Sequence, residues 1–198
     1  EGPGTIITEI PADLSKAVRG AALAEDEAII TLAGVPDIPG SSNEVFSQIA
    51  NQKITVDMIV QNIGKEGHSG LSFTIPCDEL GMTMEVIERL RQTLEIKDVS
   101  HSADVSKVSV VGSGMAHQPG VAEKMFRSIS DAGINVLMIT TSQIKISVLV
   151  HKNDARKALE AVHDTFELEI PAENELPRLS EIAHPRAEAE RVDVVDRL

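Results

Sequence analysis

The apolar and polar residues of this chain change their spacing in the same order in two long stretches. In the first stretch, period-two alternation gives way to helical spacing and returns, and this cycle then occurs once more. The predicted segments are a strand at 28–35, a helix around 45–50, a strand at 54–60, a strand at 71–75, a helix through 87–94 and a strand near 98–105. This order predicts a βαββαβ unit in which two helices cover one face of four strands.

A second copy of the pattern begins 80 residues further along the chain. GVPDIPGSSNEVFSQIANQKITVDMIVQN starts at Gly34 and GMAHQPGVAEKMFRSISDAGINVLMITTS starts at Gly114, and the two align without a gap. The matches include a Pro-Gly pair and apolar positions such as Phe46 with Phe126, which we interpret as shared core. The predicted segments of this copy are strands at 107–111, 134–140 and 144–150 and helices at 121–129 and 153–166. So many matches at one offset indicate an internal duplication.

The second copy is short of a closing strand, because only FELEI precedes Pro171. An upstream segment at 17–24 could supply that strand, and the first unit would then be an insertion inside the second. The expected division is an N-terminal segment at 1–16, a first module at 25–105, a second module at 17–24 plus 106–170, and a tail at 171–198. The composition of the tail, rich in Glu, Arg, Ala and Pro, leaves disorder and a loosely docked helix both open.

Composition and charge exclude several classes of protein. With 31 acidic and 18 basic residues the net charge is −13, which would repel a phosphate backbone, and no Tyr or Trp is present to stack on bases. No apolar run reaches the roughly 18 residues of a membrane span, and the first residues do not resemble a secretory signal. Cys77 is the only cysteine, so no internal disulfide can form. We therefore expect a cytoplasmic protein that binds neither nucleic acid nor membrane.

The motifs of catalysis are missing from the sequence. The six histidines show no metal-ligand spacing, and no Walker-type loop is present. VSVVGSGMAHQPG places Gly112 and Gly114 between a strand and a helix, as dinucleotide-binding folds do, but His117 stands where the third glycine of that fingerprint belongs. We predict no catalytic residue, no metal site and no cofactor.

Both copies open their first helix with Pro-Gly, at Pro39-Gly40 and Pro119-Gly120. The first backbone N–H groups of a helix have no intrahelical partner and lie at the positive end of the helix dipole, so they suit a carboxylate such as that of an amino acid. An ordinary turn solvated by water is the alternative for either pair taken alone. The duplication of the pair favours a binding role.

The strand after each of these helices ends in polar residues, at Gln61 and Asn62 in the first copy and over 140–142 in the second. Their side chains offer both donors and acceptors, and Asp37 could pair with an α-ammonium group, although a solvated turn residue is an equal alternative for Asp37. The copies differ where specificity would reside. Asp37 becomes His117, Thr55 becomes Asn135 and Gln61 becomes Thr141. The two pockets should therefore not be equivalent.

These residues resemble the ACT-domain regulatory region of aspartate kinases, including the separately made β subunit of the two-subunit forms. The likeness spans about 18–166 and rests on LAGVPDIPG, ITVDMIVQN, KVSVVGSGM, HQPGVAEKMF, INVLMITTS and IKISVLV, in this order. It implies an α+β fold with two ferredoxin-like βαββαβ ACT modules in tandem, nested, that dimerise through sheet edges. Nothing in the sequence resembles the lysine-and-glycine phosphate motif of the kinase domain, so the chain would be the regulatory part only.

The resemblance also implies feedback inhibition of aspartate phosphorylation by threonine, lysine or both, acting on a kinase catalytic domain or α subunit. The effector-contacting residues carried over are Asp37, Pro39, Gly40, Gln61 and Asn62 in the first module and His117, Gln118, Pro119, Gly120, Asn135, Ile139, Thr140, Thr141 and Ser142 in the second. Gln143 departs from the pattern, because many members have a glutamate there, and this puts lysine sensitivity in doubt. A stand-alone amino-acid sensor and a purely structural dimerisation module remain the alternatives. An enzyme on this common fold, such as a small-molecule hydrolase, ranks last because no catalytic constellation is present.

Overall fold

The strands form one antiparallel sheet in the order β2-β3-β1-β4-β6-β5. The computed structural model describes residues 16–64 and 67–168. The strands are β1 (Gly20–Pro36), β2 (Ile59–Asn62), β3 (His68–Pro76), β4 (Asp98–Val111), β5 (Met138–Thr141) and β6 (Lys145–His151). The helices are α1 (Ser41–Asn51), α2 (Leu80–Thr93), α3 (Val121–Asp131) and α4 (Ala155–Thr165), with short 3₁₀ turns at Cys77–Glu79, Ser113–Ala116 and Lys152–Asp154. The predicted α+β class with a ferredoxin-like sheet is confirmed.

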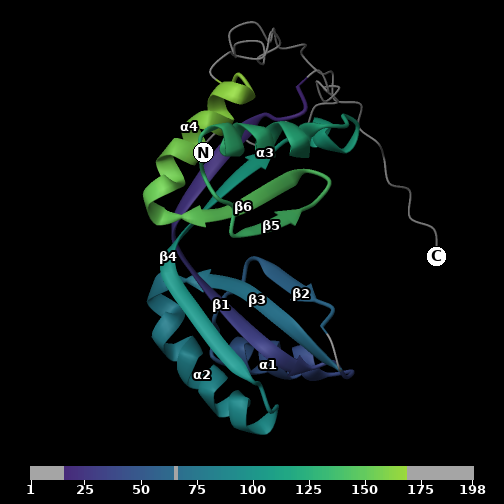
Figure 1. The fold of residues 1–198 in the computed structure, drawn as a ribbon, viewed down its shortest axis with the longest axis vertical. Coiled ribbons are helices and arrows are strands. Elements are labelled where there is room, and N and C mark those ends of the chain that lie inside the picture. The colour runs from purple at the N-terminus through teal and green to yellow at the C-terminus, as the bar shows by residue number, and fades with distance from the viewer. Residues whose placement is uncertain (1–15, 65–66, 169–198) are drawn as a thin grey trace, which may run out of the picture.

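Two long strands, β1 and β4, run through the whole molecule and join its two halves (Figure 1). The first half, residues 27–104, contains α1, α2, β2 and β3, and the second half, residues 16–24 and 105–168, contains α3, α4, β5 and β6. The predicted module boundaries therefore fall inside β1 and β4 rather than in linkers. The division into two modules stays a prediction, and residues 1–15 and the tail at 171–198 lie outside the described residues.

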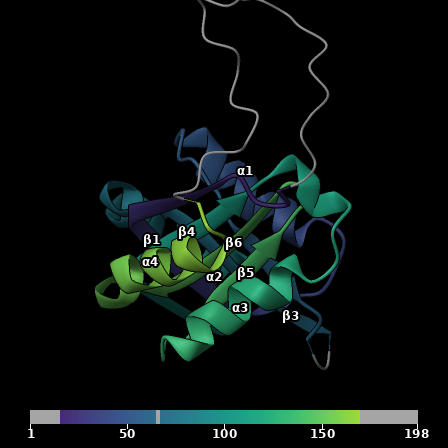
Figure 2. The same ribbon diagram turned by 90° about the horizontal axis from the view of Figure 1, so that it is seen from above.

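Each half packs its two helices against one face of its strands (Figures 1 and 2). In the first half, Phe73 and Ile30 meet Ile49 of α1 and Ile87 of α2 in one buried cluster. The cluster of the second half joins Val108 and Val148 of the sheet to Met125, Ile129, Ala158 and Val162 of α3 and α4. These are the apolar positions that the helical and alternating spacings placed on common faces.

The strand expected at 54–60 is shorter in the structure, where β2 begins only at Ile59. Backbone pairing continues before Ile59 but is irregular. Asp57 and Met58 both lie opposite Thr74: the N–H of Asp57 donates to the carbonyl oxygen of Thr74 (3.1 Å), and the N–H of Thr74 donates to that of Met58 (3.0 Å). The N–H of Met58 donates instead to the side-chain hydroxyl of Thr74 (3.1 Å), as in a β-bulge. In the same way β5 begins at Met138, four residues later than expected. The segments expected at 98–105 and 107–111 form a single strand, β4.

The glycines that imitate a dinucleotide fingerprint allow two backbone segments to approach closely. A Cβ added to Gly112 would lie 2.0 Å from the carbonyl oxygen of Ala17, and one added to Gly114 would lie 2.8 Å from that of Lys16. The segment seated there leads into β1, and the N–H of Arg19 donates to the carbonyl oxygen of Val111 (2.8 Å). This motif is thus explained by packing.

No helix within 16–64 and 67–168 is both long and apolar enough to cross a membrane. Over the same ranges, no three His, Cys, Asp or Glu side chains gather in a way that could hold a metal ion.

Candidate ligand-binding site

Both Pro-Gly pairs lie directly at the start of a helix. Gly40 caps α1 with φ 101° and Gly120 caps α3 with φ 90°, in the left-handed region where a residue with a side chain is strained. In α3, the N–H of Lys124 donates back to the carbonyl oxygen of Gly120 (2.9 Å). The amides of residues 121–123 precede this first helical bond, so they have no partner within the helix and can meet an anion.

An open pocket of about 380 Å³ lies at the start of α3. It joins the helix start to the end of β5 and to the 3₁₀ turn after β4. The lining residues are Met115, Ala116, Gln118, Gly120, Val121, Ala122, Thr141, Ser142, Gln143 and Ile146. None of them is acidic or basic, so the pocket offers backbone amides, hydroxyls and side-chain amides but no formal charge. The predicted meeting of a helix start with a polar strand end is therefore present in the second half.

The equivalent place in the first half is bridged by a side-chain hydrogen bond. Ser42 Oγ of α1 donates to Gln61 Oε1 of β2 (2.9 Å), so the helix start and the strand end again meet. Beside this bond, the hydroxyl of Ser41 is buried and has no hydrogen-bond partner in the part of the chain that the structure describes. In the second half the positions of Ser42 and Gln61 are taken by Ala122 and Thr141, which leave the pocket open.

The remaining predicted site residues do not line the pocket at α3. Asp37 is exposed in the loop before α1, and its N–H donates to the carbonyl oxygen of Gly67 (2.8 Å). Asn135 follows the C-terminal end of α3, the opposite end from Gly120. Thr140 pairs with Ser147 on the sheet face away from the helices. The other predicted residues that do not line the pocket at α3 are Pro39, Asn62, His117, Pro119 and Ile139, of which the last is half-exposed on β5.

Sequence reasoning missed several residues that line the pocket at α3. Met115 and Ala116 come from the 3₁₀ turn after β4, and Ile146 comes from β6 opposite Thr141. Ala122 had a signal, because it lies beside the matched Pro-Gly pair, yet a small apolar residue carries no chemistry of its own. The contribution of Ile146 depends on strand register, which spacing along one strand does not reveal.

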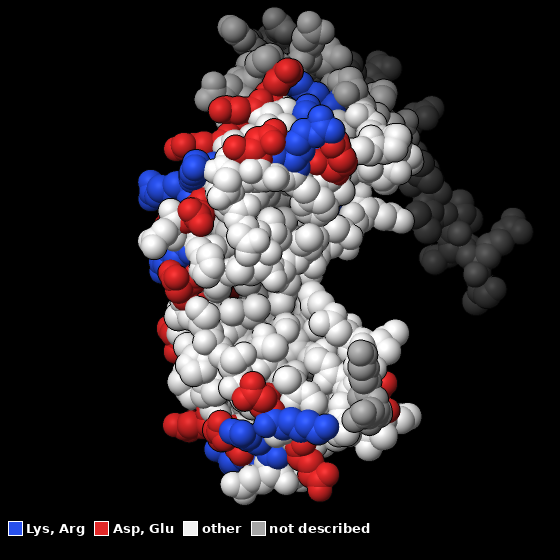
Figure 3. Space-filling model, viewed as in Figure 1, with Lys and Arg blue, Asp and Glu red and all other residues white. Residues whose placement is uncertain are grey.

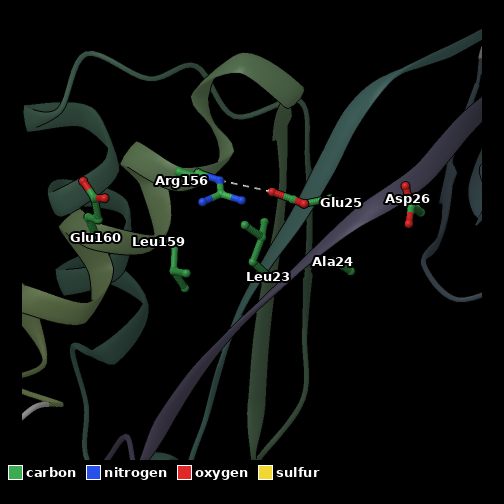
Figure 4. Close-up of a pocket in the computed structure, with 7 residues that line it drawn as sticks. All are labelled: Leu23, Ala24, Glu25, Asp26, Arg156, Leu159 and Glu160. Carbon is green, nitrogen blue, oxygen red and sulfur yellow. Dashed lines mark ion pairs between the residues drawn. The ribbon is translucent and has the colours of Figure 1, made fainter.

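A larger hollow, of about 650 Å³, lies elsewhere, between β1 and α4 (Figure 4). Leu23 and Leu159 form its apolar floor, and Arg156 Nε and Glu25 Oε1 pair at its rim, 3.5 Å apart. Both partners of this pair are well exposed to water, which screens the interaction. Arg156 lies in the first turn of α4, but the hollow is lined by neither Pro-Gly turn and by no polar strand end, so it does not have the predicted geometry of the site.

Comparison with known proteins agrees with this geometry. Residues 108–166 match the family model described as ACT domain. The chain is 35% identical over 176 residues to aspartate kinase Ask_LysC of Stutzerimonas stutzeri, a match that covers 88% of this chain and 43% of that protein. The chain thus spans less than half the length of this curated relative.

Two solved structures are matched over almost their whole length. The regulatory subunit of aspartate kinase from Thermus thermophilus, in its ligand-free form, superposes with a TM-score of 0.72 at 38% identity, covering 76% of this chain and 99% of that one. A crystal structure of aspartokinase alpha and beta subunits gives the same score and identity and covers 77% of this chain and 100% of the matched one. Because a solved regulatory subunit is matched over almost its whole length, the chain belongs to the regulatory, ACT-domain part of the aspartate kinase family.

Proposed function

We propose that this chain is an amino-acid-sensing regulatory subunit or domain of an aspartate kinase, and that the open pocket at the start of α3 binds threonine. The observation that carries the proposal is the meeting of the capped helix start at Gly120 with the hydroxyls of Thr141 and Ser142 around one open pocket. The helix amides would take the α-carboxylate of the ligand, and the hydroxyls and Gln118 would take its ammonium and side-chain groups.

The lining of the pocket favours threonine over lysine. Both amino acids carry an α-ammonium group, but lysine adds a second ammonium group on its side chain. Burying that additional charge without an anionic partner is costly, and no carboxylate lines this pocket. Gln143, at the position where the resemblance leads us to expect glutamate, supplies an amide in place of a charge. A small hydroxylated amino acid needs only the neutral donors and acceptors that are present. The pocket volume of about 380 Å³ lies at the small end of the range for ligand sites.

We propose further that the first half is a second ACT module nested within the other. Each half then has a ligand cradle, the place where a helix start meets a polar strand end: α1 with β2 in the first half and α3 with β5 in the second. The cradle of the first half is the less accessible of the two. A ligand there would have to replace the hydrogen bond between Ser42 and Gln61. The buried hydroxyl of Ser41 would then gain a partner, which offsets part of that loss.

The assembly we propose is a homodimer in which the first half of one chain faces the second half of the other. β2 and β5 are the edge strands of the sheet, and each carries or adjoins exposed apolar side chains. Ile59 lies on β2 and Ile63 follows it, whereas Leu137 precedes β5 and Ile139 lies on it. Exposed edges of this kind favour pairing with another chain. A ligand that binds one arrangement of such modules better than another shifts the equilibrium between arrangements, which is how it could control a kinase chain.

The test is calorimetric titration of the chain with threonine and with lysine. We expect saturable heat with threonine and a much weaker response with lysine. Thr141→Val removes one hydroxyl from the pocket and should weaken threonine binding by roughly threefold to tenfold, the value of one hydrogen bond. Thr140→Val is the matched control, because it makes the same change on the opposite face of the same strand.

Two outcomes would contradict the proposal. If Thr140→Val lost threonine binding and Thr141→Val kept it, the ligand would have to bind on the other face of the sheet. If neither amino acid gave heat, the alternative of a purely structural dimerisation module would be favoured. The kinase partner is tested separately, by adding the chain to an isolated aspartate kinase catalytic chain, where threonine should inhibit only when the regulatory chain is present.

A further inference from the structure

Lys107 on β4 bridges the two halves of the molecule. Its Nζ donates to Oε1 of Glu27 on β1 and to Oδ2 of Asp57, just before β2. Lys107 belongs to the second half, whereas both carboxylates belong to the first. The side chains of Lys107 and Glu27 are only 12% and 10% exposed, and that of Asp57 is 44% exposed. Removing one partner would leave a poorly solvated charge, so the halves are held to the arrangement that keeps the pairs intact.

The contact between Lys107 and Asp57 stabilises the charged form of both groups. The hydrogen bond from Lys107 lowers the pKa of Asp57, against a smaller opposing effect of burial. Burial acts to lower the pKa of Lys107, but the hydrogen bonds to Asp57 and Glu27 outweigh it and raise that pKa. The ion pair between Lys107 and Asp57 therefore persists over the whole neutral range.

The bridge lies where both long strands pass from one half to the other. The register between β1 and β4 shifts on either side of Glu27, between Ala24 and Glu27 and again between Glu27 and Ile29. Such irregularities bend a strand and increase its twist. A small apolar cluster on the face away from the helices also joins the halves here, with Met58 from the first and Leu149 from the second. In Figure 3 the walls of the hollow between the halves show uncharged side chains, consistent with this cluster.

Glu27 and Lys107 are equivalent positions of the internal repeat. They are 80 residues apart, the offset at which the two copies align. Equivalent positions that face one another lie beside the pseudo-twofold axis between the halves. If two first halves met through this surface, two Glu27 carboxylates would face each other. The opposite charges at Glu27 and Lys107 thus favour a first half meeting a second half.

The bridge is also connected along the backbone to both ligand cradles. Asp57 is four residues before Gln61, whose side chain meets the start of α1. From Lys107, β4 continues to Val111 and into the turn whose Met115 lines the pocket at α3. A shift of either segment on ligand binding would therefore pull on the same three charged groups.

We propose that Lys107, Glu27 and Asp57 form a charged latch that fixes the two halves in one arrangement and couples the two ligand cradles. The coupling to ligand rests on the proposed function, whereas the holding of the halves does not. Lys107 acts as a positioning residue that touches neither cradle.

The latch is tested with Asp57→Asn, Lys107→Met and Glu88→Gln in the full chain. Glu88 pairs with Arg91 within α2 (3.8 Å), so its replacement removes a carboxylate without touching the bridge and serves as the control. Asp57→Asn changes the more exposed partner and keeps the experiment valid if Lys107→Met fails to fold. Hydrogen exchange of the amides of Phe73 and Val148, one in each core, reports on each half during urea titration.

In the wild type and in Glu88→Gln, both core amides should become exchangeable at the same urea concentration. In the latch variants the two concentrations should separate. The folding equilibrium should shift by roughly threefold to tenfold in Asp57→Asn, and by more in Lys107→Met, which leaves the buried carboxylate of Glu27 without its partner. Added threonine should slow exchange in both halves of the wild type but only in the second half of the latch variants. A common transition in both latch variants would overturn the latch. If threonine fails to bind the wild type, the proposed function fails, and the urea result alone decides the latch.

Discussion

Replacement of Gly112 by alanine should loosen the segment that closes the second half. The φ of Gly112 is extended, so the backbone tolerates alanine, but the new Cβ would lie 2.0 Å from the carbonyl oxygen of Ala17 and 2.8 Å from the Cα of Val18. Both contacts are to backbone, so the segment must withdraw by about 1.5 Å to reach ordinary contact distance. That movement stretches the bond from Arg19 to Val111 and partly exposes Val18, now 2% exposed. Together these losses cost about 2–3 kcal/mol.

Urea denaturation followed by circular dichroism measures this cost, and the Tm should fall by roughly 5–10 °C. Gly81→Ala is the matched control. Nothing lies within 4 Å of a Cβ added there, and its φ is not in the left-handed region, so alanine in α2 should stabilise the protein by about 0.5–1 kcal/mol. If Gly112→Ala stayed within about 0.5 kcal/mol of the wild type, the close seating of this segment on the turn after β4 would be refuted.

Three further predictions concern the latch, the cores and the assembly. Because the pKa of Asp57 is lowered from 3.8 and that of Lys107 is raised from 10.5, the stability difference between the wild type and Asp57→Asn should stay nearly flat between these pH values. It should shrink below pH 3.8 as Asp57 protonates, which denaturation at several pH values checks. Ile49→Val and Ile129→Val should each cost about 0.5–1.5 kcal/mol and should add in the double variant, because the residues lie in separate cores; coupling above about 0.5 kcal/mol would mean that the cores are not independent. Light scattering should give the mass of a dimer with threonine present, and a monomer at high concentration would contradict the proposed pairing of edges.

The order of elements and the helix starts could be predicted from the sequence because they depend on local chemistry. The spacing around Val45 and Val121 placed both helices, and Gly40 and Gly120 mark their first turns because only glycine adopts the left-handed cap without strain. The late start of β2 could not be predicted in this way. It depends on the irregular pairing of Asp57 and Met58 with Thr74, residues that meet only after β3 has folded back.

The sequence predicted that the two cradles differ, but not which contact makes them differ. The exchange of Gln61 for Thr141 indicated unequal pockets. The bond from Ser42 that closes one of them requires knowing that the second residue of α1 faces the end of β2. Such a contact combines helix phase with strand register, and spacing along one segment determines only the first of these.

The charged bridge shows how a repeat could reveal more than architecture. Matches between copies identify the shared core, but near a pseudo-twofold axis the informative positions are those that differ in a complementary way. Glu27 and Lys107 occupy the same place in their copies and carry opposite charges, which a search for similarity counts only as a mismatch. Two identical copies would set like charges against each other at this position, so a duplicated chain gains by diverging there. Complementary charges at equivalent positions of a repeat are therefore evidence that the copies pack against each other near those residues.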